Sequence, residues 1–199
     1  MKPPTRRRES SRLAILDAAI ALCREEGYGK LSIEGIAARA GAGKHTIYRW
    51  WPNKSAVLMD ALDREMTANS ATFPHTDDFV ADMRATIASV SAIQANPDFG
   101  PVIAALIAEA QQQPGGGRQL LESFFKPRRV PIVERIRQAQ ADGELRAAIE
   151  PELLLEVIFG ALYHRLLLQS GPLDEAYADF VVKLVFSGLI TRPDGSPIS

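Results

Sequence analysis

Apolar residues in this chain recur at intervals of three and four positions, the spacing that places side chains on one face of an α-helix. Alternating runs of β-branched residues, which would indicate strands, are nearly absent. Helix-start and helix-stop signals divide the pattern into these segments: 10–26, 33–39, 43–50, 53–71, 78–95, 102–113, 119–142, 150–169 and 173–190. We therefore predict an all-α protein of about nine helices.

Glycine and proline divide this helical pattern into parts. Gly27 follows the first helix and Gly41 the second, positions where a left-handed backbone suits glycine. QPGGGR at 113–118 has the composition of a flexible loop, and Pro127 with Pro131 predicts a bend in the long helix that follows. The expected organisation is a polar, basic arm at 1–9, three short helices at 10–54, a helical body at 55–190 and a disordered tail at 191–199.

The charge of the chain is distributed unevenly. Residues 1–54 contain eleven Lys or Arg and five Asp or Glu, a net charge of +6, and the chain totals of 23 and 24 leave −7 for the rest. A basic module joined to an acidic body is typical of a protein whose N-terminal part meets a polyanion while the remainder has another task.

The two short helices predicted before residue 51 indicate which polyanion this module binds. Joined through a glycine turn and packed on a preceding amphipathic helix, they are typical of a helix-turn-helix. Ile47 and Trp51 are four residues apart and are predicted to face inward, with Trp51 in the core. The polar and cationic side chains gather on the outer face of the same helix: Lys44, His45, Thr46, Tyr48 and Arg49. A short cationic helix face of this kind fits the major groove of duplex DNA.

Further residues extend the predicted DNA contact. Trp50 either donates its indole N–H to a phosphate or packs against the protein. Lys54 opens the fourth helix, where positive charge and free backbone N–H groups favour a phosphate. Arg6, Arg7 and Arg8 either enter the minor groove as a mobile extension or only solubilise the chain.

The ordered motifs of this region have a recognisable pattern: ILDAA, Gly27-Tyr28, a serine before IAARAG, then TIY, an aromatic pair and a lysine that opens helix four. Residues 10–58 thereby resemble the DNA-binding domain of the tetracycline-repressor (TetR) family of bacterial transcription regulators. The resemblance implies that Ser32, Tyr48, Trp50 and Lys54 touch phosphates, and that Lys44, His45 and Arg49 lie over base edges. Gly43 departs from the pattern, because many relatives have a capping serine there, and this puts one capping or phosphate bond in doubt.

The acidic remainder carries no comparably specific motif, but the resemblance implies that it binds a small molecule and forms a homodimer. The last two helices are so apolar that a subunit interface is the economical explanation, with the monomer core as the alternative. The predicted interface residues are Leu154, Ile158, Leu162, Arg165, Tyr177, Phe180, Val181, Leu184, Val185 and Gly188.

A pocket for an effector is harder to locate from sequence. The bulky candidates for its lining are Phe99, Phe124, Phe125, Phe159 and Tyr163, although any one aromatic side chain of this kind is more often ordinary packing than the wall of a ligand site. The polar candidates are Arg84, His164 and Gln169, although a histidine inside an apolar helix is more often a core residue than a sensor.

Other classes of function are disfavoured by the residue inventory. Three histidines, one cysteine, no phosphate-binding glycine motif and no clustered metal ligands argue against an enzyme and imply no metal or cofactor. Cys23, as the single cysteine, cannot form an intrachain disulfide and fits a reducing compartment. No uncharged apolar run reaches the roughly 18 residues that span a bilayer, so we expect a cytoplasmic protein without membrane contact.

These observations favour a ligand-responsive repressor that binds a palindromic DNA operator as a homodimer and is released by a small-molecule effector. Helix 53–71 begins at a predicted phosphate contact and continues into the body, so it is the expected route of coupling. The alternative is a DNA-binding dimer controlled by a protein partner. The absence of an enclosed pocket of roughly 300 Å³ would favour this alternative.

Overall fold

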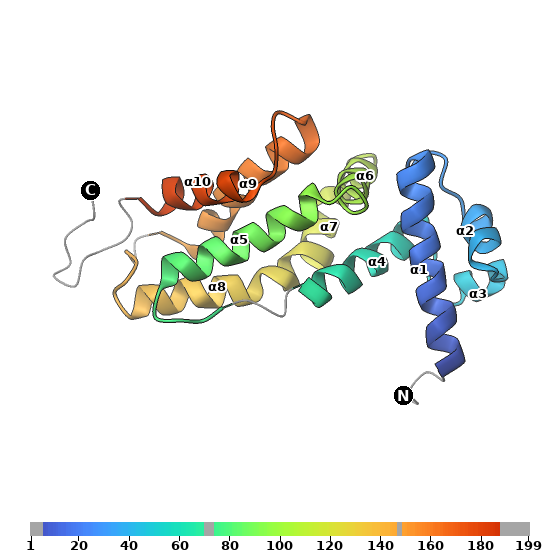
Figure 1. Cartoon of the computed structure of the whole chain (residues 1–199), viewed down its shortest axis with the longest axis horizontal. Helices are drawn as coiled ribbons and strands as arrows, with labels where there is room; N and C mark the ends of the chain where they lie inside the picture. The colour runs from blue at the N-terminus through green and yellow to red at the C-terminus, as the bar shows by residue number, and fades with distance from the viewer. Residues whose placement is uncertain (1–5, 70–73, 147–148, 188–199) are drawn as a thin grey trace. The chain divides into compact units, whose positions relative to one another are not determined.

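A computed structural model of the chain describes residues 6–69, 74–146 and 149–187 and confirms the all-α class (Figure 1). Its helices are α1 (Arg6–Glu26), α2 (Ile33–Ala40), α3 (Lys44–Tyr48), α4 (Lys54–Asn69), α5 (Phe79–Ala95), α6 (Gly100–Gln111), α7 (Gly116–Leu120), the π-helix η1 (Leu121–Phe125), α8 (Lys126–Ala141), α9 (Pro151–Leu168) and α10 (Glu175–Phe186). Because α7, η1 and α8 follow one another without a break, the described part of the chain has the nine helices expected.

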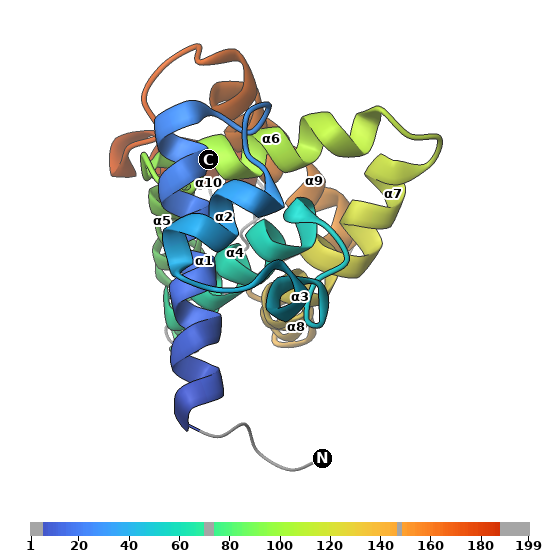
Figure 2. The same ribbon diagram turned by 90° about the vertical axis from the view of Figure 1, so that its right-hand side faces the viewer.

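The helices belong to two compact units. The N-terminal unit holds α1 to α4 together with α6, and the C-terminal unit holds α5, η1, α8, α9 and α10, with the boundary between them falling inside α7. In the N-terminal unit α2 packs on α1, and α3 packs on α2 (Figure 2). The buried apolar side chains of α1 to α4 include Ile15, Leu16, Ala19, Ile36, Ile47, Val57, Leu58, Ala61 and Leu62.

The first helix begins earlier than its apolar pattern predicts. α1 starts at Arg6 rather than at Ser10, so the backbone of Arg8 is part of a helix and not of an extended arm. Glu9 lies in the first turn, where the helix dipole stabilises a carboxylate, and it accepts a hydrogen bond from Arg12 Nη1 at 3.1 Å. Polar contacts of this kind extend a helix beyond the point where its apolar positions begin.

The segment 113–118 is not the flexible loop that its composition predicts. Gly115 has φ +74°, and α7 already begins at Gly116. A Cβ atom on Gly116 would overlap the backbone carbonyl of Ala110. The glycines are therefore required by a tight turn at the end of α6, where the two backbones approach closely.

The π-helix ends two residues before a proline. Pro127 has no N–H, so the usual bond from residue 127 to the carbonyl of residue 123 cannot form. The N–H of the preceding residue, Lys126, bonds to the carbonyl of Leu121, five residues back, which is the wider turn of a π-helix. The Arg128 guanidinium donates to the carbonyl of Phe124. Both Phe124 and Phe125 lie in this irregular turn.

The C-terminal unit is a bundle in which α5 contacts α8, α9 and α10. Its core contains Met83, Ile87, Ile132, Ile136, Leu154, Leu155, Ile158, Leu162, Val181 and Val182. At one end of the bundle the rings of Phe79 and Phe186 meet edge to face with centroids 5.1 Å apart. These contacts use the inner faces of α9 and α10.

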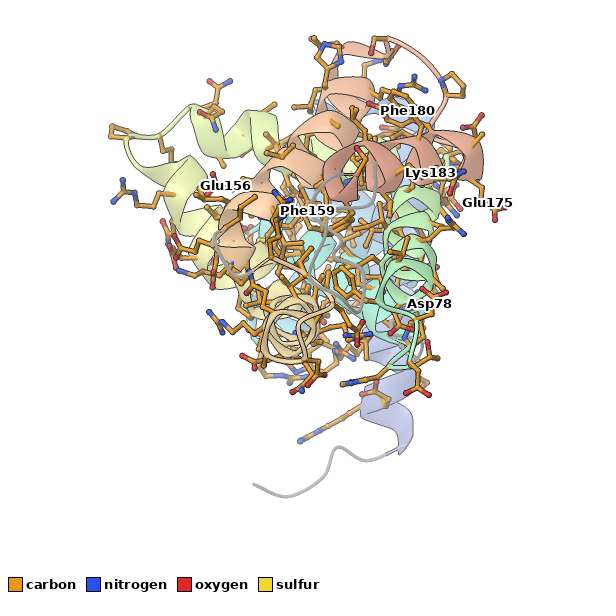
Figure 3. All side chains as sticks on the ribbon, turned by 90° about the vertical axis from the view of Figure 1, so that its left-hand side faces the viewer. Asp78, Glu156, Phe159, Glu175, Phe180 and Lys183 are labelled. Carbon is orange, nitrogen blue, oxygen red and sulfur yellow. The ribbon has the colours of Figure 1, made fainter. Side chains whose placement is uncertain are left out.

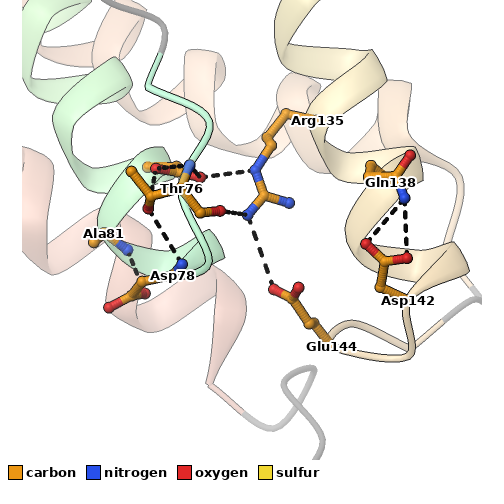
Figure 4. Close-up of polar contacts among 8 residues, drawn as sticks. Thr76, Asp78, Ala81, Arg135, Gln138, Asp142 and Glu144 are labelled. Atoms are coloured by element: carbon orange, nitrogen blue, oxygen red, sulfur yellow. Dashed lines mark hydrogen bonds and ion pairs between the residues drawn. The ribbon is translucent and has the colours of Figure 1, made fainter.

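A buried ion pair fixes the start of α5 to α8 (Figure 4). Arg135 Nε donates to Asp82 Oδ2 at 2.8 Å, and the two side chains are only 7% and 1% exposed. Thr76 donates its backbone N–H and its hydroxyl to the same carboxylate, at 3.0 and 2.8 Å, and its carbonyl accepts from Arg135 Nη2 at 3.2 Å. Burial raises the pKa of Asp82, but the hydrogen bonds from Arg135 and Thr76 outweigh it, and the net pKa lies below its usual value.

Candidate nucleic-acid interface

The helix-turn-helix is built by local signals at each of its ends. Ser32 caps α2 by accepting a hydrogen bond from the N–H of Gly35 at 3.1 Å. Gly41 ends α2 with φ +62°, which is the left-handed conformation expected there. Gly43 precedes α3 without a side-chain capping bond. α3 is therefore a short helix held mainly by what it packs against.

Two side chains fix the rotation of α3. Ile47 is completely buried, and Trp51 is buried just beyond the end of the helix. The indole Nε1 of Trp51 donates to Asp60 Oδ2 on α4 at 2.9 Å, and Arg12 Nε of α1 donates to the same oxygen at 3.2 Å. Because Ile47 is buried and Trp51 is bonded to α4 through Asp60, α3 cannot turn about its axis without breaking these contacts.

The opposite side of α3 faces solvent. The exposed side chains are Lys44, His45, Tyr48 and Arg49, and those of Thr46 and Trp50 are half-buried. The Arg49 guanidinium lies 5.4 Å from the centroid of the Trp50 ring, and Trp50 meets Trp51 edge to face. The cationic face predicted from the sequence is thus present in the structure, with the base-facing candidates turned away from the core.

One of these cations already has a partner. Lys44 Nζ forms an ion pair with Glu34 Oε1 of α2 at 2.8 Å. Its hydrogen bond to Glu34 raises the pKa of Lys44, and the same bond lowers the pKa of Glu34. Both groups are exposed, and such surface pairs add little stability. Lys44 therefore remains able to exchange Glu34 for another anion.

In the C-terminal unit four of the predicted pocket residues form one aromatic cluster. The ring of Phe125 lies 5.2 Å from that of Phe124 and 6.0 Å from that of Tyr163, and Tyr163 stacks on Phe159 at 6.1 Å. The Arg129 guanidinium sits 4.1 Å from the Phe159 centroid. Burial raises the pKa of Tyr163, although Arg129 lowers it in part. The cluster combines apolar walls with a phenol and a cation.

A groove of about 240 Å³ lies between α8 and α9 beside this cluster. Its apolar lining is Leu121, Val130, Val133 and Leu155. Its charged lining is Glu122, Lys126, Arg129, Glu134, Arg137, Glu152 and Glu156. The volume is below the roughly 300 Å³ at which typical ligand pockets begin. This groove is therefore not the enclosed pocket that the sequence analysis sets as the mark of a small-molecule effector.

A set of large apolar side chains on α9 and α10 is exposed. On α9 these are Leu153, Val157, Leu167 and Leu168, and on α10 they are Phe180 (57% exposed) and Leu184 (62% exposed), with Phe180 labelled in Figure 3. Gly160 lies on the same side of α9, and a Cβ there would have no neighbour within 4 Å. We call these seven residues the α9–α10 face.

Two family models match the chain. The model described as "Bacterial regulatory proteins, tetR family" matches residues 15–61, and the model described as "Tetracyclin repressor-like, C-terminal domain" matches residues 73–185. The second match alone spans more than half of the chain. The chain belongs to the TetR family. It is therefore a helix-turn-helix transcriptional regulator rather than an enzyme.

Two similar proteins of 30% identity or more agree with this assignment, and a third, more distant structure shows the same fold. The "DNA-binding transcriptional repressor TetR" of Mycobacteroides abscessus is 31% identical over 191 residues, covering 94% of this chain and 97% of the relative. The crystal structure of the TetR family regulator SCO0332 is 30% identical with a TM-score of 0.70, covering 88% and 97%. The regulator FadR from Bacillus subtilis, solved in complex with stearoyl-CoA, is 21% identical with a TM-score of 0.70, covering 89% and 98%.

The remaining candidates for DNA contact are placed as follows. Ser32 and Arg8 are exposed, and the Ser32 hydroxyl is already used in capping α2. The side chains of Arg6 and Arg7 lie outside the described residues. Lys54 is half-buried and donates to the carbonyls of Tyr28 at 2.9 Å and Leu31 at 3.0 Å. Its ammonium is thus engaged inside the protein.

Four pocket candidates do not join the aromatic cluster. Arg84 pairs with Asp179 of α10. His164 is exposed rather than a core histidine, with Nδ1 3.0 Å from the Ser170 hydroxyl, and Gln169 is exposed just after α9. Phe99 is buried at the start of α6 and belongs to the N-terminal unit. Spacing along one helix cannot show whether a polar side chain finds a partner on another.

The predicted subunit interface requires a larger correction. Leu154, Ile158, Leu162 and Val181 are buried in the core of the C-terminal unit, so the alternative explanation holds for these four. Val185 is half-buried against that core. Arg165 lies 3.3 Å from the Tyr177 ring, and Tyr177 donates its hydroxyl to the carbonyl of Ala161. Only Phe180 and Leu184 are strongly exposed, and Gly188 lies outside the described residues.

Sequence reasoning missed the residues that hold the helix-turn-helix in place. Asp60, Arg12 and Tyr28 each connect segments far apart in the chain and were not among the candidates. Asp60 gave one usable signal, because it is a carboxylate close to Val57, Leu58, Ala61 and Leu62, which are fully buried. A carboxylate in such surroundings needs a donor nearby. No local pattern identified Trp51 and Arg12 as those donors.

Proposed function

We propose that this chain is a repressor that binds a palindromic DNA operator as a homodimer and releases it when a small molecule binds the C-terminal unit. The observation that carries the proposal is the division of α3 into two sides. Ile47 and Trp51 hold one side in the core, while Lys44, His45 and Arg49 leave the other side free to enter a major groove.

The side chains around α3 divide into two roles. Lys44, His45 and Arg49 are exposed and in position to meet base edges, where a guanidinium pairs best with guanine. The residues that border this face serve as phosphate contacts: Ser32, Thr46, Tyr48 and Trp50. Arg6, Arg7 and Arg8 are further candidates for DNA contact at the start of α1. Lys44 can leave Glu34 for a DNA group at a small cost in free energy, because the ion pair between Lys44 and Glu34 is exposed to solvent.

The α9–α10 face supports a homodimer. It exposes six large apolar side chains on two helices that contact each other, and monomeric proteins rarely expose large apolar patches. Gly160 adds a second argument, because glycine inside a helix destabilises it by about 1 kcal/mol relative to alanine. Among the residues that the structure describes, a Cβ at this position would have no neighbour within 4 Å, so packing inside the described part of the chain does not require a glycine there. Close approach of a partner helix accounts for both observations.

The aromatic cluster supports an effector site in the C-terminal unit. Phe124, Phe125, Phe159 and Tyr163 provide apolar surface, and Arg129 provides a cation at its edge. An apolar molecule carrying a polar or anionic group suits this chemistry. The related fold of the FadR regulator, which was solved with stearoyl-CoA, shows that this architecture accommodates a ligand of that general kind in another protein.

Selection of binding sites from random duplex DNA tests the DNA-binding part of the proposal. We expect a palindrome whose two half-sites lie about one helical turn apart, roughly 34–36 Å, or somewhat more. The selected duplex is then titrated at low salt by fluorescence anisotropy. Failure to bind any duplex in dilute salt, or a recovered site without twofold symmetry, contradicts the proposal.

A second experiment separates control by a small molecule from control by a protein partner. Thermal denaturation is measured with stearoyl-CoA, other acyl thioesters and apolar carboxylates as probes, and each binder is added to the protein–operator complex. We expect a binder that raises the melting temperature to weaken operator binding. A tight binder that leaves operator affinity unchanged argues against effector control. Loss of that binder's effect in Phe125→Ala locates its site at the aromatic cluster.

A further inference from the structure

The turn between α1 and α2 lies against the first residues of α4. α1 ends at Glu26, Gly27 adopts φ +81°, and the chain turns through residues 28–30 before Ser32 caps α2. Leu31, inside this connection, is buried. α4 starts with Lys54 and Ser55, more than twenty residues later in the chain. Contacts between these two segments therefore link the entry of the helix-turn-helix to the helix that leaves it.

Lys54 makes most of these contacts. Its Nζ donates to the carbonyl oxygens of Tyr28 at 2.9 Å and of Leu31 at 3.0 Å, and lies 4.1 Å from the centroid of the Tyr28 ring. The Tyr28 hydroxyl is 2.7 Å from Oγ of Ser55. We call this set, formed by Tyr28, Leu31, Lys54 and Ser55, the Lys54 clamp.

The position of Lys54 suits this internal role better than contact with a phosphate. An ammonium has three N–H donors, and two of them are used by carbonyls while an aromatic ring covers another side. α4 does not need the lysine for its own capping, because Asn53 accepts the N–H of Ala56 at 2.9 Å. Contact with a phosphate would require the ammonium to give up part of this set of partners.

We propose that Lys54 is a positioning residue for DNA binding, which holds the α1–α2 turn on the first turn of α4 and so fixes the orientation of α2 and α3. The proposal rests on the proposed function in that DNA is the ligand whose binding it supports. The connection is direct: Leu31 is followed by Ser32, the cap of α2, and α2 packs on α3. The clamp therefore joins the start of α4 to the cap of α2.

Salt dependence distinguishes this role from a phosphate contact. The logarithm of the binding constant falls with the logarithm of salt concentration, with a slope of about −0.9 for each phosphate neutralised. We expect Lys54→Met to weaken operator binding by about tenfold, as for loss of one charge-assisted hydrogen bond, with the slope unchanged. Lys30→Met is the matched control for the loss of one charge, because Lys30 is exposed in the same turn and outside the clamp.

Amide hydrogen exchange gives a readout that is independent of DNA. In Lys54→Met the amides of residues 31–36 are expected to exchange faster, while those of α4 beyond its first turn keep their wild-type rates. Tyr28→Phe removes only the bond to Ser55 and carries no change of charge. It is expected to show a smaller loss of affinity in the same direction and remains informative if Lys54→Met does not fold.

Each outcome decides the proposal. A slope for Lys54→Met that is smaller in magnitude by about one, with unchanged exchange in residues 31–36, assigns Lys54 to a phosphate and overturns it. Unchanged affinity and exchange in both variants also overturn it. Wild-type protein that binds no duplex refutes the proposed function instead, and accelerated exchange in Lys54→Met then still identifies the clamp as a structural contact.

Discussion

The exposed face on α9 and α10 makes a quantitative prediction for Leu184→Gln. Full burial of a leucine side chain stabilises a protein by about 1.5–3 kcal/mol. Leu184 is 62% exposed in the single chain, so a partner can still contribute about two-thirds of that amount, or about 1–2 kcal/mol. A twofold dimer contains the contact twice, and the substitution should weaken dimerisation by about 2–4 kcal/mol, or about 30- to 700-fold in the dissociation constant.

Sedimentation equilibrium over a range of protein concentrations measures this change. Val130→Gln is the matched control, because Val130 is similarly exposed on α8 and lies outside the α9–α10 face. Both variants should retain the wild-type helical signal in circular dichroism, since both positions are exposed. If Leu184→Gln and Val130→Gln shift the dimer dissociation constant equally, or if neither shifts it, the face is not the subunit interface.

Three further predictions concern the DNA-binding face of α3 and the buried polar contacts of the two units. Arg49→Ala should weaken binding to the selected operator by about 1–3 kcal/mol and relax its preference at one or two base pairs, and equal losses on operator and random duplexes in competition titrations would exclude base reading. Trp51→Phe removes the N–H that Asp60 accepts and should lower the free energy of unfolding of the N-terminal unit by about 1–3 kcal/mol in urea melts, whereas unchanged stability would show that this bond does not hold α3. Asp82→Asn removes the buried carboxylate partner of Arg135, leaves it only the longer pair with Glu144 at 3.9 Å, and should lower the stability of the C-terminal unit by about 3–5 kcal/mol at neutral pH. The folded-state pKa of Asp82 is depressed, so the stability that its carboxylate contributes is present above the unfolded pKa of about 4 and is lost as pH falls through the folded pKa. The variant should therefore lack this part of the loss of stability in acid. Parallel stability profiles against pH for the two proteins would contradict this role of Asp82.

The helix-turn-helix was predictable because its determinants are close together in sequence. Ser32 and Gly35 are three residues apart, and Ile47 and Trp51 are four apart, so spacing alone gives the cap and the buried side of α3. The outer face then follows by geometry. The start of α1 was less predictable, since the polar first turn carries no apolar periodicity and depends on contacts such as that between Glu9 and Arg12.

The faces of α9 were not predictable in the same way. This helix is apolar nearly all round, and for such a helix the period of 3.6 residues does not identify which side is buried. A choice that differs by one residue rotates the assignment by about 100°. A rotation of this size separates the buried residues Leu154 and Ile158 from their neighbours in sequence, Leu153 and Val157, which are exposed.

The sequence by itself determined the all-α class, the helix-turn-helix and the cationic face of α3, because each follows from residues within one or two helical turns of one another. Tertiary structure alone decided the partners of charged groups. Lys54 meets a carbonyl 26 positions away, and Arg135 meets Asp82 across 53 positions. A charged group that is removed from water is stable only beside an opposite charge or a carbonyl, and tertiary packing decides which of these lies near it. The spacing of residues along the sequence does not give the distance between such groups in the folded chain.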